Sequence, residues 1–207
     1  ERIEIPESVN KFEYSCFDSC ESLKSAVIKA KLKKPGAYVF KNCKALENVT
    51  LAEGVEVIGQ HMFAYCENLR EINIPSSVTT IMKYAFFNCI NLNTINGGAG
   101  IKRIDRGAFF NTGFFNNPEN RENGALYLNK WLLDVDKSEK SFEIKDETVC
   151  VSVGAFNDCS KLKSVSVPAS LESMGDYNIF DGCSSLESIN VNEDSNYLSS
   201  ENGILFN

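Results

Sequence analysis

The chain has 207 residues, of which 43% are hydrophobic, and it carries a formal net charge of −7. Hydrophobic content of this size is ordinary for a folded chain. The negative charge argues against nucleic acid as a partner, because neutralising phosphates drives that kind of binding. No apolar stretch approaches the roughly 20 residues that a membrane-spanning helix needs, so we expect no membrane insertion in this segment.

A period of 23 residues organises the first half of the chain. Three positions recur at this interval: a phenylalanine (Phe17, Phe40, Phe63, Phe86), a cysteine (Cys20, Cys43, Cys66, Cys89) and a leucine (Leu23, Leu46, Leu69, Leu92). A unit this short cannot bury a core alone, so successive units must stack on one another. We therefore expect residues 1–207 to form a single repeat solenoid, with both termini cut within repeats.

Within one unit, two kinds of local structure are expected. The pattern L-x-x-I-x-I-P, clearest at residues 69–75, alternates apolar and polar residues as a strand with one buried face does. The A-F-x-x-C-x-x-L portion has i, i+3 spacing, which suits a short helical or 3₁₀ turn. Stacking then places equivalent strands side by side and parallel, about 4.8 Å apart. The fold class is thus a β-rich solenoid.

The periodic cysteines occupy one equivalent position, which Thr112 fills in a later unit and which Cys159 and Cys183 fill further on. A position that accepts Cys or Thr is small and mostly buried. The side chains of stacked neighbours point in parallel, which favours free thiols, although a disulfide ladder is an alternative. Zinc is disfavoured because the chain has one histidine and no C-x-x-C pair.

The period fails over residues 116–141. After a polar run, ALYL and WLLDV flank the pair Asn129-Lys130, which predicts an inserted β-hairpin. The repeat pattern then resumes and includes Phe156. The final stretch, with Asn202-Gly203, echoes the Asn123-Gly124 of the insertion.

The repeat resembles a known family. The segments LREINIP (69–75) and AFFNCINL (85–92) are similar to the BspA-type leucine-rich repeat, also called the Treponema-type repeat. The resemblance implies a leucine-rich repeat array, although Pro and then Ser-Val stand where the ordinary leucine-rich repeat carries N/C-x-L, a departure that favours a flatter unit with extended segments on both sides over a helix-backed horseshoe. It also implies a secreted or cell-surface bacterial protein whose partner is a host or microbial surface protein.

The outward side of the strands is the first candidate binding face. Its residues are mostly small and polar, and could meet a protein, or a glycan, through many hydrogen bonds: Ser25, Asn48, Thr50, Glu71, Asn73, Thr94, Asn96, Ser164, Ser166, Ser188 and Asn190. It lacks the Trp, Tyr and Arg anchors of tight interfaces. The plainer interpretation is a sheet face covered by solvent.

An aromatic patch at the insertion is the second candidate. Phe114, Phe115, Tyr127 and Trp131 gather there in the sequence. An adhesin should contain a patch that breaks the repeat and presents aromatic residues, and this is the one break of that kind. Alternatively, Trp131 simply packs the hairpin onto the repeats. A buried Trp131 would favour a structural role.

No catalytic, metal-binding or cofactor-binding residues are expected. His61 is the sole histidine and falls at a variable position, which we expect to be exposed and without function. Asp134 and Asp136 could attract a cation, but no EF-hand loop surrounds them, so solvated loop charge is the plainer interpretation. With no acid, base and nucleophile to assemble, the chain is expected not to be an enzyme.

The sequence therefore favours a protein–protein interaction or adhesion module. The alternative is a structural spacer in a larger surface protein, with no ligand of its own.

Overall fold

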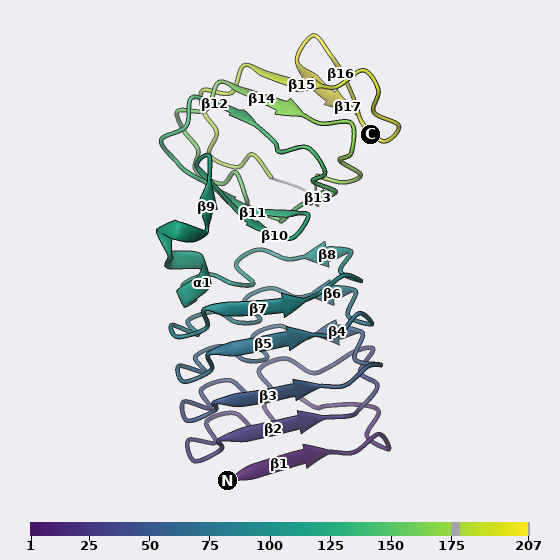
Figure 1. The fold of residues 1–207 in the computed structure, drawn as a ribbon, viewed down its shortest axis with the longest axis vertical. Helices are drawn as coiled ribbons and strands as arrows, with labels where there is room; N and C mark the ends of the chain where they lie inside the picture. The colour runs from purple at the N-terminus through teal and green to yellow at the C-terminus, as the bar shows by residue number, and fades with distance from the viewer. Residues whose placement is uncertain (175–178, 207) are drawn as a thin grey trace. The chain divides into compact units, whose positions relative to one another are not determined.

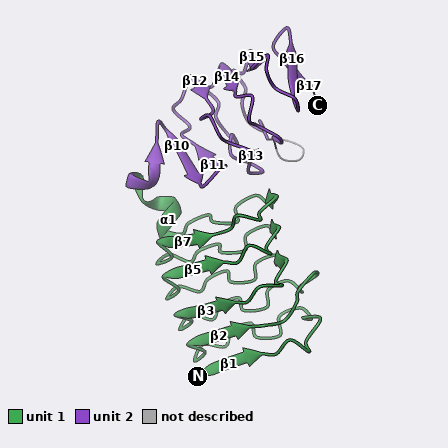
Figure 2. Ribbon diagram, turned by 45° about the vertical axis from the view of Figure 1, so that its right-hand side comes forward, with its two compact units in different colours: residues 1–118 green, residues 119–207 purple. Residues whose placement is uncertain are grey.

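The computed structural model describes residues 1–174 and 179–206, and the chain divides into two compact units, residues 1–118 and 119–207 (Figure 2). Each unit is a β-rich coil built from stacked turns, which confirms the predicted repeat solenoid. The boundary between the units falls within the predicted insertion. The expectation of one continuous solenoid over residues 1–207 stays a prediction.

The first unit carries one long parallel sheet along its coil (Figure 1). Its strand order is β1-β2-β3-β5-β7, so each turn of the coil contributes one strand. Buried and exposed residues alternate along β3 and β5, as the L-x-x-I-x-I-P pattern predicts. The strands are β1 (Arg2–Ile5), β2 (Ser25–Ile28), β3 (Asn48–Leu51), β5 (Glu71–Ile74) and β7 (Thr94–Gly97).

The return path of each turn forms two further ladders. Two-residue strands pair in parallel as β4 (Val57–Ile58), β6 (Thr80–Ile81) and β8 (Arg103–Ile104). Beyond them, the A-F-x-x-C segments hydrogen-bond from layer to layer: the amide of Phe63 donates to the carbonyl of Ala85 over 2.8 Å, and Phe86 donates to Ala108 over 2.8 Å. The turns that contain β4, β6 and β8 are therefore tied to one another on three sides.

The predicted short helical or 3₁₀ turn is present as a series of tight turns of the 3₁₀ type. Cys66 donates to the carbonyl of Phe63 over 3.1 Å, which is the i to i+3 bond of a 3₁₀ turn. The backbone does not continue as a helix, because two residues per turn have positive φ. In the fourth turn these are Tyr84 (φ 58°) and Asn88 (φ 59°). In the fifth turn Gly107 (φ 68°) and Asn111 (φ 57°) take the same places.

A ladder of phenylalanine rings fills the core of the first unit. Phe40, Phe63 and Phe86 are fully buried, and successive rings stack with centroids 5.7 and 5.5 Å apart. Phe17 and Phe109 extend the stack at its two ends, 5.1 Å from Phe40 and 5.4 Å from Phe86. The periodic phenylalanines thus form the aromatic core expected of stacked repeats.

The cysteine position is buried, as its sequence indicates. Cys43, Cys66, Cys89 and Cys159 are buried, and all eight cysteines are free thiols. Four thiols of the ladder, those of Cys43, Cys66, Cys89 and Cys183, donate to the carbonyl of the phenylalanine one turn earlier; the distance from Cys89 to Phe63 is 3.0 Å. Where Thr112 replaces cysteine, its hydroxyl donates to Phe109 and accepts from the amide of Phe115 over 3.1 Å, which caps helix α1 (Gly113–Asn116).

The second unit contains a parallel sheet of the same kind and three hairpins, one of which is the predicted insertion. Strands β12, β14 and β15 pair in parallel, one to a turn, while β9-β10 and β16-β17 are antiparallel. Asn-Gly turns at positive φ, the usual two-residue hairpin turn, join both pairs. The elements are η1 (Pro118–Asn120), β9 (Arg121–Glu122), β10 (Ala125–Leu128), β11 (Trp131–Val135), β12 (Ser141–Glu143), β13 (Cys150–Val151), β14 (Ser164–Val167), β15 (Ser188–Val191), β16 (Ser199–Glu201) and β17 (Ile204–Phe206). Asn207 lies outside the described residues.

The inserted hairpin is confirmed, but the insertion is shorter than residues 116–141. β10 and β11 are antiparallel around Asn129, as predicted. β11 also pairs in parallel with β13, and the amide of Val135 donates to the carbonyl of Ala155 over 2.9 Å. In other turns a phenylalanine makes this bond. Val135 therefore takes the phenylalanine position, and β11 begins a shortened repeat whose long strand is β12.

Candidate functional site

The strand face of the first unit brings together the seven candidate residues predicted there. Parallel registry aligns Ser25 with Asn48, Thr50 with Asn73, and Asn73 with Asn96. Ser25 is half-buried, whereas the other six are exposed, because the alternate side chains of each strand face the core. Two rows of polar side chains run across the sheet as a result: Ser25, Asn48, Glu71 and Thr94 in one, and Thr50, Asn73 and Asn96 in the other.

Hydrogen bonds link neighbouring side chains on this face. The Asn96 amide donates to Glu71 over 2.8 Å and to the Asn73 side-chain oxygen over 3.0 Å. At the first strand, Glu4 accepts from Lys29 at 2.6 Å, and this ammonium lowers the pKa of the Glu4 carboxyl. The middle of the face is therefore joined by hydrogen bonds around the Glu71 carboxylate, and β1 carries ion pairs.

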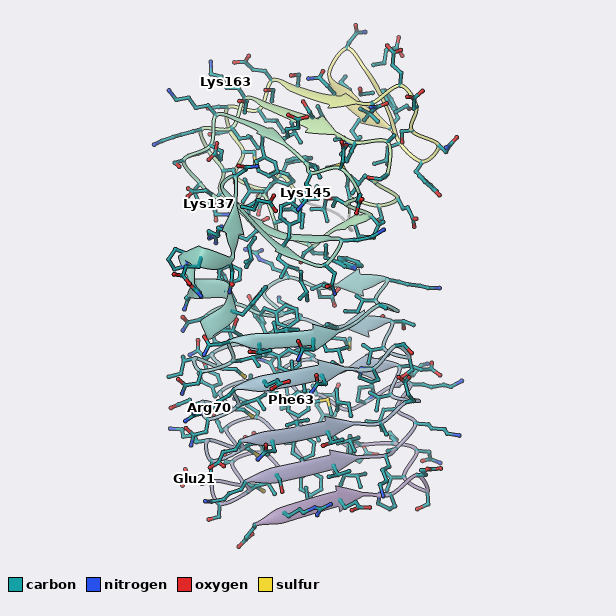
Figure 3. All side chains as sticks on the ribbon, viewed as in Figure 1. Glu21, Phe63, Arg70, Lys137, Lys145 and Lys163 are labelled. Atoms are coloured by element: carbon teal, nitrogen blue, oxygen red, sulfur yellow. The ribbon has the colours of Figure 1, made fainter. Side chains whose placement is uncertain are left out.

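A shallow hollow of about 570 Å³ lies at β3 and β5. Four predicted residues line it: Asn48, Thr50, Glu71 and Asn73. Sequence analysis missed its other lining residues, which precede or interleave with the strands: Glu47, Val49, Asn68 and Arg70. Figure 3 shows Arg70 beside the start of β5. The sequence does place Arg70 directly before this strand, and arginine is enriched among the residues that anchor interfaces, so Arg70 could have been identified as a candidate from the sequence.

The strand face of the second unit is built in the same way. Ser164 aligns with Ser188, and Ser166 with Asn190, as the repeat predicts. β12 adds Ser141 and Glu143 to these rows, which sequence analysis missed because it placed Ser141 in the insertion. A hollow of about 540 Å³ lies here, with Ser164 and Ser166 in its lining.

Tyr127 and Lys145 also line this second hollow. The Lys145 amide donates to the Tyr127 hydroxyl over 3.2 Å, and its ammonium pairs with Glu122 at 2.7 Å. Burial raises the pKa of the Tyr127 phenol. Figure 3 places Lys145 in this part of the second unit. Tyr127 is thus held by contacts within its own unit and contributes a half-buried ring to the hollow.

The predicted aromatic patch is not an exposed anchor of the kind an adhesin would need. Trp131, in β11, is only 5% exposed, and Tyr127, Phe114 and Phe115 are half-buried. Phe114 and Phe115 belong to the first unit, where the ring of Phe115 packs against that of Phe110 at 5.0 Å. The alternative interpretation of Trp131, as a packing residue, agrees with its burial.

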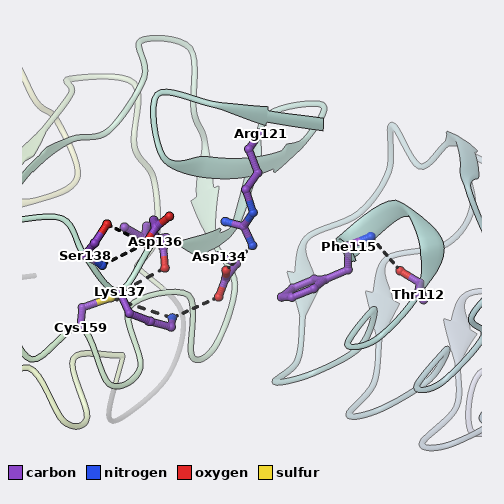
Figure 4. A network of polar contacts seen from close by, with 9 residues as sticks. Thr112, Phe115, Arg121, Asp134, Asp136, Lys137, Ser138 and Cys159 are labelled. Atoms are coloured by element: carbon purple, nitrogen blue, oxygen red, sulfur yellow. Dashed lines mark hydrogen bonds and ion pairs between the residues drawn. The ribbon is translucent and has the colours of Figure 1, made fainter. Parts of the chain in front are cut away.

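The carboxylates considered for a cation are engaged by the chain itself (Figure 4). Asp134 accepts from Arg121 over 2.7 Å and from Lys137 over 3.2 Å. Asp136 accepts from the amide and the hydroxyl of Ser138, both at 2.9 Å, which lowers the pKa of its carboxyl. Among residues 1–174 and 179–206, no group of three His, Cys, Asp or Glu side chains could hold a metal ion.

His61 is not an exposed surface residue, contrary to the prediction. It is half-buried, and its ring stacks on that of Tyr38 at 4.8 Å and lies 5.1 Å from that of Tyr84. Burial lowers the pKa of the imidazole, and the ammonium groups of Lys41 and Lys83 lower it further. Sequence analysis missed this cluster, although tyrosine and histidine recur at the 23-residue interval there.

None of the helices in the described part of the chain is both long and apolar enough to cross a membrane.

Comparison with known proteins gives a family match and a set of similar folds. Residues 1–115 and 135–202 match six copies of the "BspA type Leucine rich repeat region". The unmatched residues between them, 116–134, end just before Val135, the residue that takes the phenylalanine position of the shortened repeat. A comparison with curated proteins gives no match.

Among solved structures, a leucine-rich cell surface protein from Faecalibacterium prausnitzii A2-165 is 22% identical, with a TM-score of 0.50. The alignment covers 91% of this chain and 60% of that protein, so this chain spans less than two thirds of its length. A leucine-rich repeat protein of T. pallidum is 21% identical, with a TM-score of 0.44 and coverage of 91% and 68%. The pneumococcal vaccine antigen PcpA is 19% identical, with a TM-score of 0.36 and coverage of 91% and 50%.

Proposed function

Because the chain belongs to the BspA-type leucine-rich repeat family, we propose that it is a non-enzymatic binding module of a secreted or cell-surface bacterial protein. Its partner is a host or microbial surface protein, and a glycan is the alternative ligand. The binding surface is the strand face of the first unit, centred on Thr50, Asn73 and Asn96.

The polar rows of this face carry the proposal. Parallel registry holds Thr50, Asn73 and Asn96 at fixed spacing, and hydrogen bonds between the side chains of Asn73, Asn96 and Glu71 limit their freedom. Side chains that are ordered beforehand lose little conformational entropy on binding. Arg70 beside the hollow supplies an anchor that the small polar residues lack.

Surface plasmon resonance against panels of purified surface proteins and glycans tests this proposal. A triple variant, Thr50→Arg, Asn73→Arg and Asn96→Arg, places bulky cations on the strand face without touching the core. The matched control carries three arginines at exposed positions elsewhere in the first unit: Ser8→Arg, Tyr14→Arg and Ala99→Arg. We expect the first variant to lose binding and the control to retain it. Equal binding by both would refute the strand face as the site.

A structural spacer is the second candidate function. The burial of Trp131 favours it, because the patch that breaks the repeat then offers no exposed tryptophan to a partner. A spacer has no ligand of its own, so the panels would give no saturable binding at all. That outcome would replace the first proposal by the second.

A further inference from the structure

A second surface of the first unit carries a cluster of aromatic rings, which the strand face lacks, together with two lysines. It lies on the tight-turn side of the coil and is here called the aromatic edge: Tyr38, His61, Tyr84, Tyr65 and Phe87, with Lys41 and Lys83. Its rings form one connected cluster. Tyr84 contacts Phe87 at 5.4 Å and Tyr65 contacts Phe87 at 5.4 Å, which joins both to the stack of Tyr38 on His61.

The fold does not require aromatic residues at these positions. Tyr38, His61 and Tyr84 have φ of 62°, 50° and 58°, a conformation that disfavours bulky side chains. Ser15 and Gly107 take the same place in neighbouring turns, and glycine adopts this conformation without strain. His61 also has its Nδ1 atom buried without a hydrogen-bond partner among the described residues. The backbone conformation therefore gives no reason for aromatic rings at these positions, which is consistent with a role other than folding.

The faces of the column are already covered. His61 packs between Tyr38 and Tyr84, and the backbone of Gly107 lies so close to the Tyr84 ring that there is no space for a Cβ atom at residue 107. A sugar that binds by stacking needs a free ring face, so the column suits such a ligand poorly. Ring edges, which carry partial positive charge, and the tyrosine hydroxyls remain for a partner.

The charge of the aromatic edge is positive, although the chain as a whole is acidic. The Lys41 ammonium lies 5.5 Å from the centroid of Tyr38, and that of Lys83 lies 5.1 Å from the centroid of Tyr84. Both groups depress the pKa of the His61 imidazole between them, which shows that their fields overlap there. Residues 1–118 contain fourteen basic and twelve acidic residues, whereas the second unit has seven and sixteen. A partner for this surface should therefore carry negative charge.

Apolar side chains continue the surface. Phe110 occupies the position of Phe87 one turn later and is 48% exposed. Carboxylates alone would leave this apolar area uncovered. We propose that the aromatic edge binds an acidic polypeptide segment in which Asp or Glu alternates with apolar residues, its carboxylates meeting Lys41 and Lys83 and its apolar side chains meeting Phe87 and Phe110.

This binding surface is separate from the strand face, and each can fail without the other. The probe is a fluorescein-labelled 12-residue peptide of alternating Glu and Leu, compared with the same peptide carrying Lys or Gln in place of Glu. We expect the full chain to bind the Glu peptide in an anisotropy titration and to bind the Lys and Gln peptides at least about tenfold more weakly.

Two variants place that binding on the aromatic edge. Lys41→Glu with Lys83→Glu should weaken it about tenfold or more, whereas Lys24→Glu with Lys102→Glu, which changes net charge equally, should leave it within about twofold. Tyr38→Gly with Tyr84→Gly removes two rings at positions where glycine is favoured, so the fold should persist while affinity falls.

Three results would overturn the proposal: equal binding of the Glu and Gln peptides, equal losses in the two lysine variants, or loss of binding only in the Thr50, Asn73 and Asn96 variant of the strand face. A sulfated oligosaccharide that binds more tightly than the Glu peptide, and through Lys41 and Lys83, would reassign the surface to an anionic glycan and would also overturn it.

Discussion

Replacing Phe86 by alanine tests whether the aromatic ladder holds the first unit together. The Phe86 ring is fully buried and stacks between Phe63 and Phe109, with centroids 5.5 and 5.4 Å away. Truncation removes both contacts and leaves a cavity. The backbone around it cannot close, because Phe86 donates to Ala108 and Phe63 donates to Ala85, each over 2.8 Å. Phe-to-Ala changes in such cores cost about 3–5 kcal/mol, and we expect about 4 kcal/mol here.

The assay is urea denaturation followed by far-UV circular dichroism, with hydrogen exchange to locate the loss. Repeat arrays can unfold in parts, so the amides of β5 and β7 should lose protection first. Phe110→Ala is the matched control, because it removes a phenylalanine ring of the next turn that lies outside the ladder and is 48% exposed. It should cost less than about 1 kcal/mol. Equal losses in the two variants would refute the ladder as the main source of stability.

Three further predictions concern thiols, protonation and the tryptophan. Cys16 is exposed and should react first with a disulfide reagent at pH 8, whereas Cys66 and Cys89 should stay protected until the chain unfolds. Burial raises the pKa of both thiols, that of Cys89 to about 12, so neither forms the reactive thiolate in the folded chain. Fast reaction of Cys89 in the folded chain would contradict this prediction. Folding lowers the pKa of His61 below its ordinary value of 6.5, so the unfolded chain binds the proton more readily, and the free energy of unfolding should fall as the pH drops below about 6.5. The His61→Asn variant should lose less stability than the original chain between pH 7.5 and 5.5. The same pH dependence in both proteins would contradict this prediction. Trp131 fluorescence should be blue-shifted and resist iodide quenching, and strong quenching would contradict its burial.

The repeat made much of each unit predictable. In a stacked array, each residue contacts the residues at the equivalent positions of the turns above and below. A residue type that recurs every 23 residues therefore identifies its own neighbours, and its burial can be predicted. That is why Phe40, Phe63 and Phe86 could be assigned to one buried ladder, and Thr112 to the cysteine position, without any structure. The polar rows of the strand face followed from the same registry.

Positions where the repeat varies were harder to predict. Ser15, Tyr38, His61, Tyr84 and Gly107 share one backbone conformation but no chemical character. Only the glycine signals positive φ, and a single glycine does not reveal a column of rings. The stacking of His61 between two tyrosines depends on side-chain directions that periodicity alone does not specify.

The insertion shows a different limit. Val135 makes the interlayer bond of the phenylalanine position without being aromatic, so the shortened repeat that begins with β11 was hidden from a search for A-F-x-x-C. The burial of Trp131 could not be predicted from the sequence either, because the same apolar hairpin sequence can face a core or the solvent.

Site-specific photo-crosslinking tests the proposed binding role most directly. A benzophenone amino acid replaces Asn73 at the centre of the strand face, or Ala99 as an exposed control, and each chain is irradiated on intact host cells and on intact bacteria. The account predicts a discrete cross-linked surface protein from position 73, lost when Thr50→Arg and Asn96→Arg are added, and none from position 99. Identical patterns from both positions, or no product from position 73 on either kind of cell, would contradict it.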